Sequence, residues 1–101
     1  DIRLGKICEA EIFSNARIPA IKLLIDFGSE IGLKKSSAQI CDNYSPKLLI
    51  GMNIFAVVNF FPKQIGNFMS EVLVLGTTDL DKKGVILAVP DSEALIGGRM
   101  L

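Results

Sequence analysis

The chain has 101 residues, no histidine, two cysteines, and equal numbers of basic and acidic side chains, 11 of each. This length fits one domain around a single hydrophobic core, so we expect residues 1–101 to form one unit. Without histidine the chain lacks the usual general base and the commonest zinc ligand, and we expect no enzyme, no metal and no cofactor. Zero net charge excludes a molecule that attracts phosphate backbones over its whole surface.

Hydropathy and charge are unevenly distributed. Half of the residues are apolar, which favours burial of apolar surface against another chain, so we expect a homo-oligomer. The longest nearly uncharged apolar run, residues 48–62, is shorter than the about 20 residues that span a bilayer. With no charged-then-apolar leader in view, we expect a cytoplasmic protein without a membrane span. Residues 31–70 carry four basic and one acidic side chain and form the only positively biased third.

The two cysteines, Cys8 and Cys41, lie in apolar stretches without close-spaced partners. This pattern favours buried free thiols over a disulfide or a metal-ligand role.

Apolar periodicity predicts six strands and one short helix. Residues 3–12 alternate in polarity, as in a strand with one core face, and residues 54–60 read as a strand buried on both faces. Ser45, Pro46 and Gly51 supply an N-cap, a first-turn proline and a terminating glycine for a helix of about a turn and a half. The strands are expected at residues 3–12, 20–27, 32–40, 54–60, 72–75 and 85–89.

Three strands, a short helix and further strands follow one another in the order of the OB fold. This fold is an all-β, five-stranded Greek-key barrel that binds ligands on one face and through the loops after its first and fourth strands. Here those loops are residues 13–19 and 59–70.

The loop 59–70 holds three phenylalanines, a methionine and one lysine within twelve positions. Aromatic side chains beside a cation suit base stacking in a nucleic-acid site, and they equally suit a groove for apolar polypeptides. Phe60 and Phe68 could instead belong to the core. Lys34 and Lys35 are adjacent on a predicted strand, so only one of them can join a common patch, and a solvated pair is an equal alternative.

Two acidic motifs give little support for catalysis or for metal binding. Glu9 and Glu11 share one face of the first predicted strand, where a solvated surface explains them. Asp79, Asp81 and Gly84 faintly resemble a calcium loop, but its other ligand positions are missing.

Residues 58–71, Val-Asn-Phe-Phe-Pro-Lys-Gln-Ile-Gly-Asn-Phe-Met-Ser-Glu, resemble the signature of the tRNA-binding domain. That domain occurs in free-standing tRNA-binding proteins and at the end of some methionyl-tRNA synthetases. Residues 1–7 and 49–51 are similar to the same family. Residues 26–28, 34–40 and 70–76 are similar to its CsaA branch, whose members are described as protein-export chaperones, and the likeness covers essentially the whole chain.

The resemblance implies an OB barrel whose terminal extensions form a homodimer, and it implies two activities: holding unfolded export precursors and binding tRNA. The family's tRNA-contacting motif would fall on Asn59, Lys63, Ser70 and Glu71, with support from Lys34, Lys35 and Ser36. Gln64 and Asn67 stand where basic residues are frequent in the tRNA binders. Fewer basic residues predict fewer phosphate contacts.

Two hypotheses follow. The first is a non-catalytic, chaperone-like binding module, favoured by neutral charge and high hydropathy, with Lys63 at the rim of an apolar groove that the dimer completes. The groove would be lined by Phe60, Phe61, Ile65, Phe68 and Met69. The second, favoured by the motif, is a structure-specific tRNA-binding protein related to the C-terminal domain of methionyl-tRNA synthetase. It would place Lys34, Lys35 and Lys63 on phosphates and Asn59 and Ser70 on an RNA corner or loop.

Overall fold

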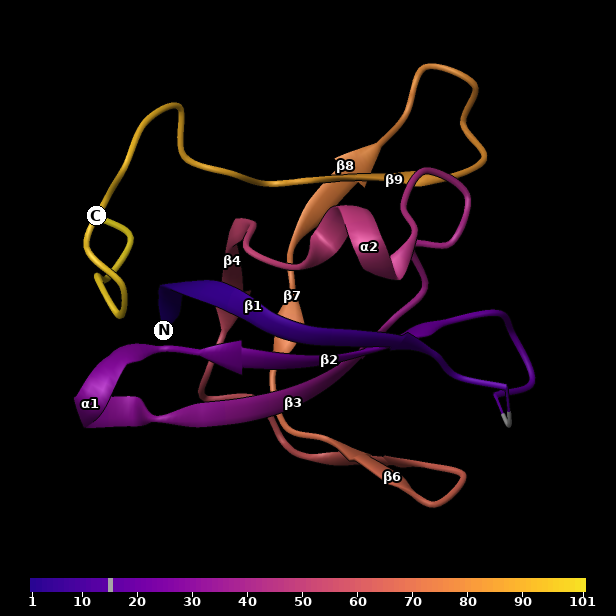
Figure 1. Cartoon of the computed structure of the whole chain (residues 1–101), viewed down its shortest axis with the longest axis horizontal. Coiled ribbons are helices and arrows are strands. Elements are labelled where there is room, and N and C mark those ends of the chain that lie inside the picture. Colours follow the sequence, from indigo (N-terminus) through magenta and orange to yellow (C-terminus); the bar gives the residue numbers. More distant parts are fainter. Residues whose placement is uncertain (15) are drawn as a thin grey trace.

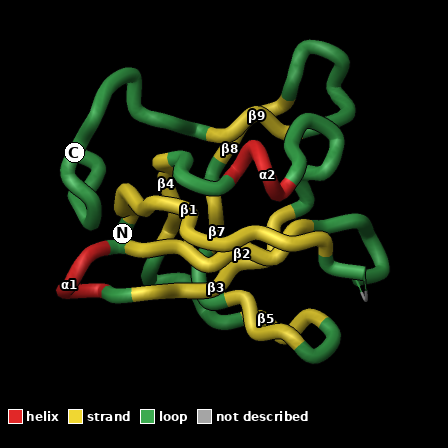
Figure 2. Tube along the Cα trace, viewed as in Figure 1, coloured by secondary structure: helices red, strands yellow, loops and turns green. Residues whose placement is uncertain are grey.

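A computed structural model describes residues 1–14 and 16–101 of the chain. Its centre is an antiparallel sheet with strand order β3-β2-β1-β4-β7 (Figure 1). These strands are β1 (Ile2–Ile12), β2 (Ile21–Asp26), β3 (Leu33–Ala38), β4 (Asn53–Val57) and β7 (Leu73–Val74). Outside the sheet lie the helical turns α1 (Gly28–Ile31) and α2 (Pro46–Leu49), the hairpin of β5 (Lys63–Ile65) and β6 (Phe68–Ser70), and the hairpin of β8 (Gly76–Thr78) and β9 (Val85–Leu87) (Figure 2).

The sheet curls into a nearly closed barrel because its two outer strands, β3 and β7, approach each other. The helical turn α2 stands between β3 and β4 in the chain. The predicted all-β, five-stranded OB-type barrel with a short helix at this place is therefore confirmed. Among the described residues, no helix is both long and apolar enough to cross a membrane.

Three predicted elements differ from the structure. Residues 59–70, expected as a loop, contain the β5–β6 hairpin, and residues 76–78, which lie between the strands expected at 72–75 and 85–89, form β8. The strand expected at 54–60 ends at Val57, because its partners Ile2 and Leu73 are the end residues of β1 and β7. Its two faces are also unequal: Ile54 and Ala56 are buried, while the residues between and after them are half-buried.

The core depends on one position without a side chain. Gly5 of β1 pairs with Ile54 of β4, and both are buried. A Cβ atom at Gly5 would lie 2.5 Å from Ile25 Cγ2 and 2.6 Å from Phe27 Cε1. The absence of a side chain at this position therefore lets Ile25 and Phe27 fill the centre of the barrel.

The buried thiol predicted for Cys8 is wrong, because Cys8 is exposed. The pairing of β1 with β2 shifts between Ile7, opposite Ile25, and Glu9, opposite Leu24. Cys8 is the extra residue of this bulge, and such an insertion interrupts the alternation on which the prediction relied. Cys41 is half-buried, and both thiols are free.

The edge of β3 meets residues 70–72, which lead from the end of β6 to β7, in a seam that side chains help to close. The Glu71 N–H donates to the Lys35 carbonyl at 2.8 Å, and the Lys35 N–H donates to Glu71 Oε1 at 2.9 Å. The Ser37 N–H donates to Ser70 Oγ at 3.0 Å. The Ser36 hydroxyl donates to the Val72 carbonyl at 2.9 Å. Two serine hydroxyls and one carboxylate thus supply bonds that a regular strand ladder would take from the backbone.

We expect Gly5→Ala to lower the free energy of unfolding by about 1–3 kcal/mol, because the added methyl group overpacks the core. Urea denaturation measures this change. Cys8→Ala, an exposed position on the same strand, serves as the control and should stay within about 0.5 kcal/mol of the parent protein. Equal stabilities of the two variants would contradict the assigned packing.

A second expectation concerns the seam. Ser36→Ala leaves the Val72 carbonyl without its donor in a buried site, and we expect a loss of about 1–3 kcal/mol in the free energy of unfolding. The matched control is Ser37→Ala, because Ser37 joins the seam through its backbone N–H, which alanine keeps. If both variants unfold at the same urea concentration, the Ser36 hydroxyl does not hold the seam.

Candidate binding surfaces around the β5–β6 hairpin

The β5–β6 hairpin projects from the barrel beside β3 (Figure 1). Its anchor is Phe68, whose ring meets the buried Phe13 ring edge-on, with centroids 5.6 Å apart. The anchored hairpin separates recesses of different chemistry on its two sides.

The first recess, the apolar groove, has a volume of about 340 Å³. One wall is the end of β3 and the residues after it, and the others come from β5, β7 and β9. Most of the lining is aliphatic or aromatic, with Lys63 as its one charged side chain. The lining residues are Ser37, Ala38, Gln39, Ile40, Phe60, Lys63, Ile65, Ser70, Leu73, Val74, Val85 and Leu87.

The second recess, the loop groove, adjoins the first and has a volume of about 570 Å³. It lies between the hairpin and the loop that follows β1. Its lining includes two cations, Arg17 and Lys63, and no carboxylate. Because Lys63 and Ile65 line both grooves, the two form one continuous surface with an apolar part and a basic part.

The third recess, the lysine pocket, lies on the outer face of β1 and β2 and has a volume of about 270 Å³. Its wall toward the hairpin is Phe68, with Lys22 Nζ 5.4 Å and Lys35 Nζ 5.5 Å from the ring centroid. The lining residues are Glu9, Ala10, Glu11, Lys22, Leu23, Leu24, Lys35 and Phe68.

The residues expected to contact tRNA are not gathered in one place. Ser36 and Ser70 are only 1% and 4% exposed, and their hydroxyls take part in the seam. The Glu71 carboxylate accepts the Lys35 N–H in the same seam. Lys63 is exposed on the grooves.

The two adjacent lysines behave as strand geometry requires. Lys35 is exposed and lines the lysine pocket, whereas Lys34 is half-buried and lines none of the three recesses. Neighbouring residues on a strand point to opposite faces, so only one of this pair reaches the surface beside the hairpin.

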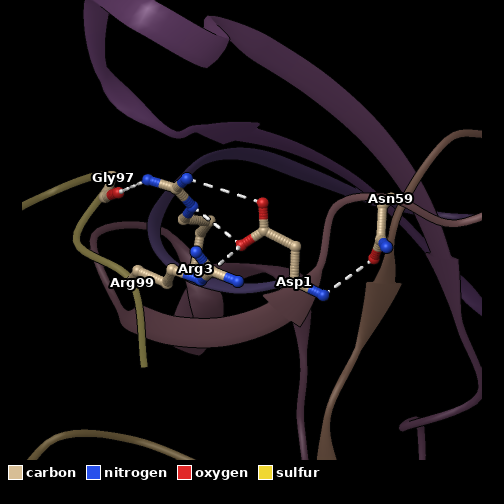
Figure 3. Close-up of polar contacts among 5 residues, drawn as sticks. All are labelled: Asp1, Arg3, Asn59, Gly97 and Arg99. Atoms are coloured by element: carbon tan, nitrogen blue, oxygen red, sulfur yellow. Dashed lines mark hydrogen bonds and ion pairs between the residues drawn. The ribbon is translucent and has the colours of Figure 1, made fainter. Parts of the chain in front are cut away.

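Asn59 lies at a separate polar cluster that joins the two ends of the described chain (Figure 3). Its Oδ1 accepts a hydrogen bond from the backbone amine of Asp1 at 2.9 Å. The Asp1 carboxylate is 2.9 Å from Arg3 Nε and 3.6 Å from Arg99 Nε, and Arg3 Nη1 donates to the Gly97 carbonyl at 3.0 Å. This cluster holds the last residues against β1, away from the hairpin.

The residues expected to line one client groove are also divided. Phe60 and Ile65 line the apolar groove, while Phe68 faces the lysine pocket. Phe61, which is 93% exposed, and Met69 line none of the three recesses. Sequence reasoning missed Leu73, Val85 and Leu87 as groove residues, although all three stand in strands that it predicted.

The acidic tip of the β8–β9 hairpin is occupied by internal hydrogen bonds. Asp79 accepts bonds from the Asn43 side-chain amide at 2.8 Å and from the backbone N–H groups of Lys83 and Gly84 at 3.1 Å. These donors hold the pKa of Asp79 below its ordinary value, and the Asn43 amide has the largest effect. In the part of the chain that the structure describes, no group of three or more acidic, cysteine or histidine side chains is arranged to hold a metal ion.

Comparison with known proteins identifies the family. Residues 2–99 match the family described as "Putative tRNA binding domain". The chain is 32% identical over 106 aligned positions to the methionine–tRNA ligase of Thermococcus kodakarensis, an alignment that covers 99% of this chain but 13% of that ligase. The chain therefore spans only a small part of the curated relatives it matches.

Two solved structures are similar to this chain over about nine-tenths of their own chains. The chaperone CsaA of Bacillus anthracis is 50% identical, with a TM-score of 0.91 over 100% of this chain and 90% of that one. The CsaA chaperone protein of Picrophilus torridus is 51% identical, with a TM-score of 0.91 over 100% of this chain and 91% of that one. The chain thus belongs to the tRNA-binding domain family, within its CsaA-type branch.

Proposed function

We propose that residues 1–101 act as one non-catalytic binding domain that holds extended apolar segments of unfolded export precursors. The observation that carries this proposal is the apolar groove. Its walls combine Phe60, Ile65, Leu73 and Leu87 with a single cation, Lys63. Side chains of an unfolded polypeptide would be removed from water against these walls, which stabilises the complex by about 25 cal/mol per Å² of buried apolar surface.

The similarity to two CsaA chaperones over 90% and 91% of their chains supports this proposal. The groove also remains partly open to solvent, since Leu73 is 45% exposed. A half-exposed apolar wall is suited to reversible capture, because the groove can exist without its occupant.

We further propose that the protein works in the cytoplasm as a homodimer. Residues 95–100 present exposed apolar side chains, Leu95 and Met100, on a segment that the Asp1–Arg3–Arg99 cluster fixes against β1. A second copy could cover these side chains.

A second function, tRNA binding, is favoured by the family and by the loop groove. Arg17 and Lys63 line this groove without an acidic neighbour in its lining, which suits contact with phosphates. Because the net charge of the chain is zero, contacts with phosphates depend on such local groups of cations and not on the charge of the whole molecule.

The polypeptide proposal is tested with Leu73→Thr. We expect the affinity for a fluorescein-labelled apolar decapeptide to fall about fivefold, because a half-buried leucine contributes about 1 kcal/mol of transfer free energy. Fluorescence anisotropy measures the peptide affinity, and light scattering of a denatured export precursor measures suppression of aggregation. Ile86→Thr is the matched control, since Ile86 is 43% exposed but lies outside the apolar groove. Equal peptide affinities of the two variants would show that the peptide does not bind in the apolar groove.

The tRNA proposal is tested by the salt dependence of binding. Each of Arg17→Ala and Lys63→Ala is expected to lower the slope of log affinity against log salt by about 0.7–0.9, because each loses one phosphate contact. Lys47→Ala, on α2 and away from the recesses, should leave the slope unchanged. Absence of tRNA binding by the parent protein at low salt would refute this function outright.

A further inference from the structure

The lysine pocket takes no part in the proposed polypeptide binding, and it places two lysine ammonium groups beside one aromatic ring. Lys22 and Lys35 both place Nζ within 5.5 Å of the centroid of the Phe68 ring. Lys22 has one ion pair, a 3.9 Å contact with Glu11, and the described residues offer Lys35 none within 4.0 Å. Two ammonium groups beside one ring repel each other, and an anion between them removes that repulsion.

The size and the floor of the pocket restrict which class of molecule can carry the anionic group. The volume of about 270 Å³ lies just below the about 300–1,000 Å³ of sites for drug-sized ligands. Its floor is apolar, from Ala10 and Leu24, and its wall is aromatic, from Phe68. A base that is splayed out of a single-stranded RNA loop needs such a combination of apolar surface and aromatic side chain.

Two carboxylates of β1 also border the pocket, and one of them, that of Glu11, lies 3.9 Å from Lys22 Nζ. Glu9 and Glu11 are exposed on β1 and pair with Leu24 and Lys22 of β2, so they border the same pocket as the lysines. An ionised carboxylate only accepts hydrogen bonds. Cytosine, adenine and guanine carry an exocyclic amino group that donates to it, as cytosine N4 donates to glutamate in base recognition, whereas uracil has no such group.

From this arrangement we propose that the lysine pocket binds one unstacked nucleotide of a tRNA loop. Its phosphate lies between Lys22 and Lys35, and the exocyclic amino group of its base faces Glu9 and Glu11. This inference rests on the proposed tRNA binding, and it adds selectivity against uracil. An acidic peptide would also satisfy the two lysines, but the aromatic wall of Phe68 and the apolar floor favour a base.

The test uses fluorescein-labelled tetranucleotides of C, A and U, with anisotropy as the readout, and whole tRNA in parallel. We expect the parent protein to bind the C and A tetranucleotides at least about fivefold more tightly than U. Lys35→Ala should weaken all three together and lower the salt slope by about 0.7. The substitution keeps the backbone groups of Lys35 that belong to the seam. Lys34→Ala is the control, because Lys34 is the neighbouring lysine outside the pocket.

The carboxylates are tested separately with the double variant Glu9→Gln, Glu11→Gln. It should lose the preference for C over U without losing affinity for U, since the amide side chains both donate and accept. If the two residues had only a structural role, their substitution would leave the base preference unchanged. Retention of the full preference in this variant would contradict the proposed base contact.

Failure of this inference and failure of tRNA binding give different results. If tRNA binds but Lys35→Ala behaves as Lys34→Ala does, the nucleotide is not in the lysine pocket, and tRNA binding stands. If neither tRNA nor any tetranucleotide binds at low salt, both proposals are wrong. If Lys35→Ala weakens an acidic apolar peptide and leaves RNA affinity unchanged, the pocket serves polypeptides and the RNA inference is overturned.

Discussion

The seam between β3 and residues 70–72, which lead into β7, is the constraint on which the rest of the molecule depends. These two segments close the barrel with bonds from the Ser36 and Ser70 hydroxyls and the Glu71 carboxylate. Backbone hydrogen bonds of a regular strand ladder would continue along both edges. The side-chain hydrogen bonds of the seam join the edges over only a few residues. Beyond the seam the edges separate, and the apolar groove opens between the end of β3 and the strands β5, β7 and β9. Closure at one point therefore produces the recess beside it.

The hairpin that follows β4 then divides the surface by chemistry. Phe68 packs on Phe13 and holds the hairpin over the barrel. On one side aliphatic side chains gather with Lys63, and on the other Lys22 and Lys35 gather with two glutamates. The apolar groove and the lysine pocket share no lining residue. A neutral protein can in this way present an apolar surface for polypeptide and a charged surface for RNA.

The strand order could be predicted from sequence because residues 20–27 and 54–60 form apolar runs, and a short helix with a proline in its first turn stands between β3 and β4. The β5–β6 hairpin could not, because only three residues pair on each strand, too few to show a period. The motif did not indicate the structural part that its residues play: Ser70 and Glu71 of the signature, and Ser36 of the segment 34–40, form hydrogen bonds of the seam. The sequence around Lys22 does not indicate a binding role. Lys22 comes close to Lys35 and Phe68 only through strand pairing and hairpin packing between residues far apart in sequence.

The central claim is that an apolar polypeptide segment and an unstacked nucleotide bind separate recesses on the two sides of the hairpin, the apolar groove and the lysine pocket. Competition by anisotropy tests it most directly: a labelled apolar decapeptide is bound first, and an unlabelled C tetranucleotide, short enough to occupy one recess, is then added to saturation. Separate recesses predict that the peptide affinity stays unchanged. Displacement of the peptide with a midpoint equal to the dissociation constant of the tetranucleotide would show that both bind one surface, and would contradict the account.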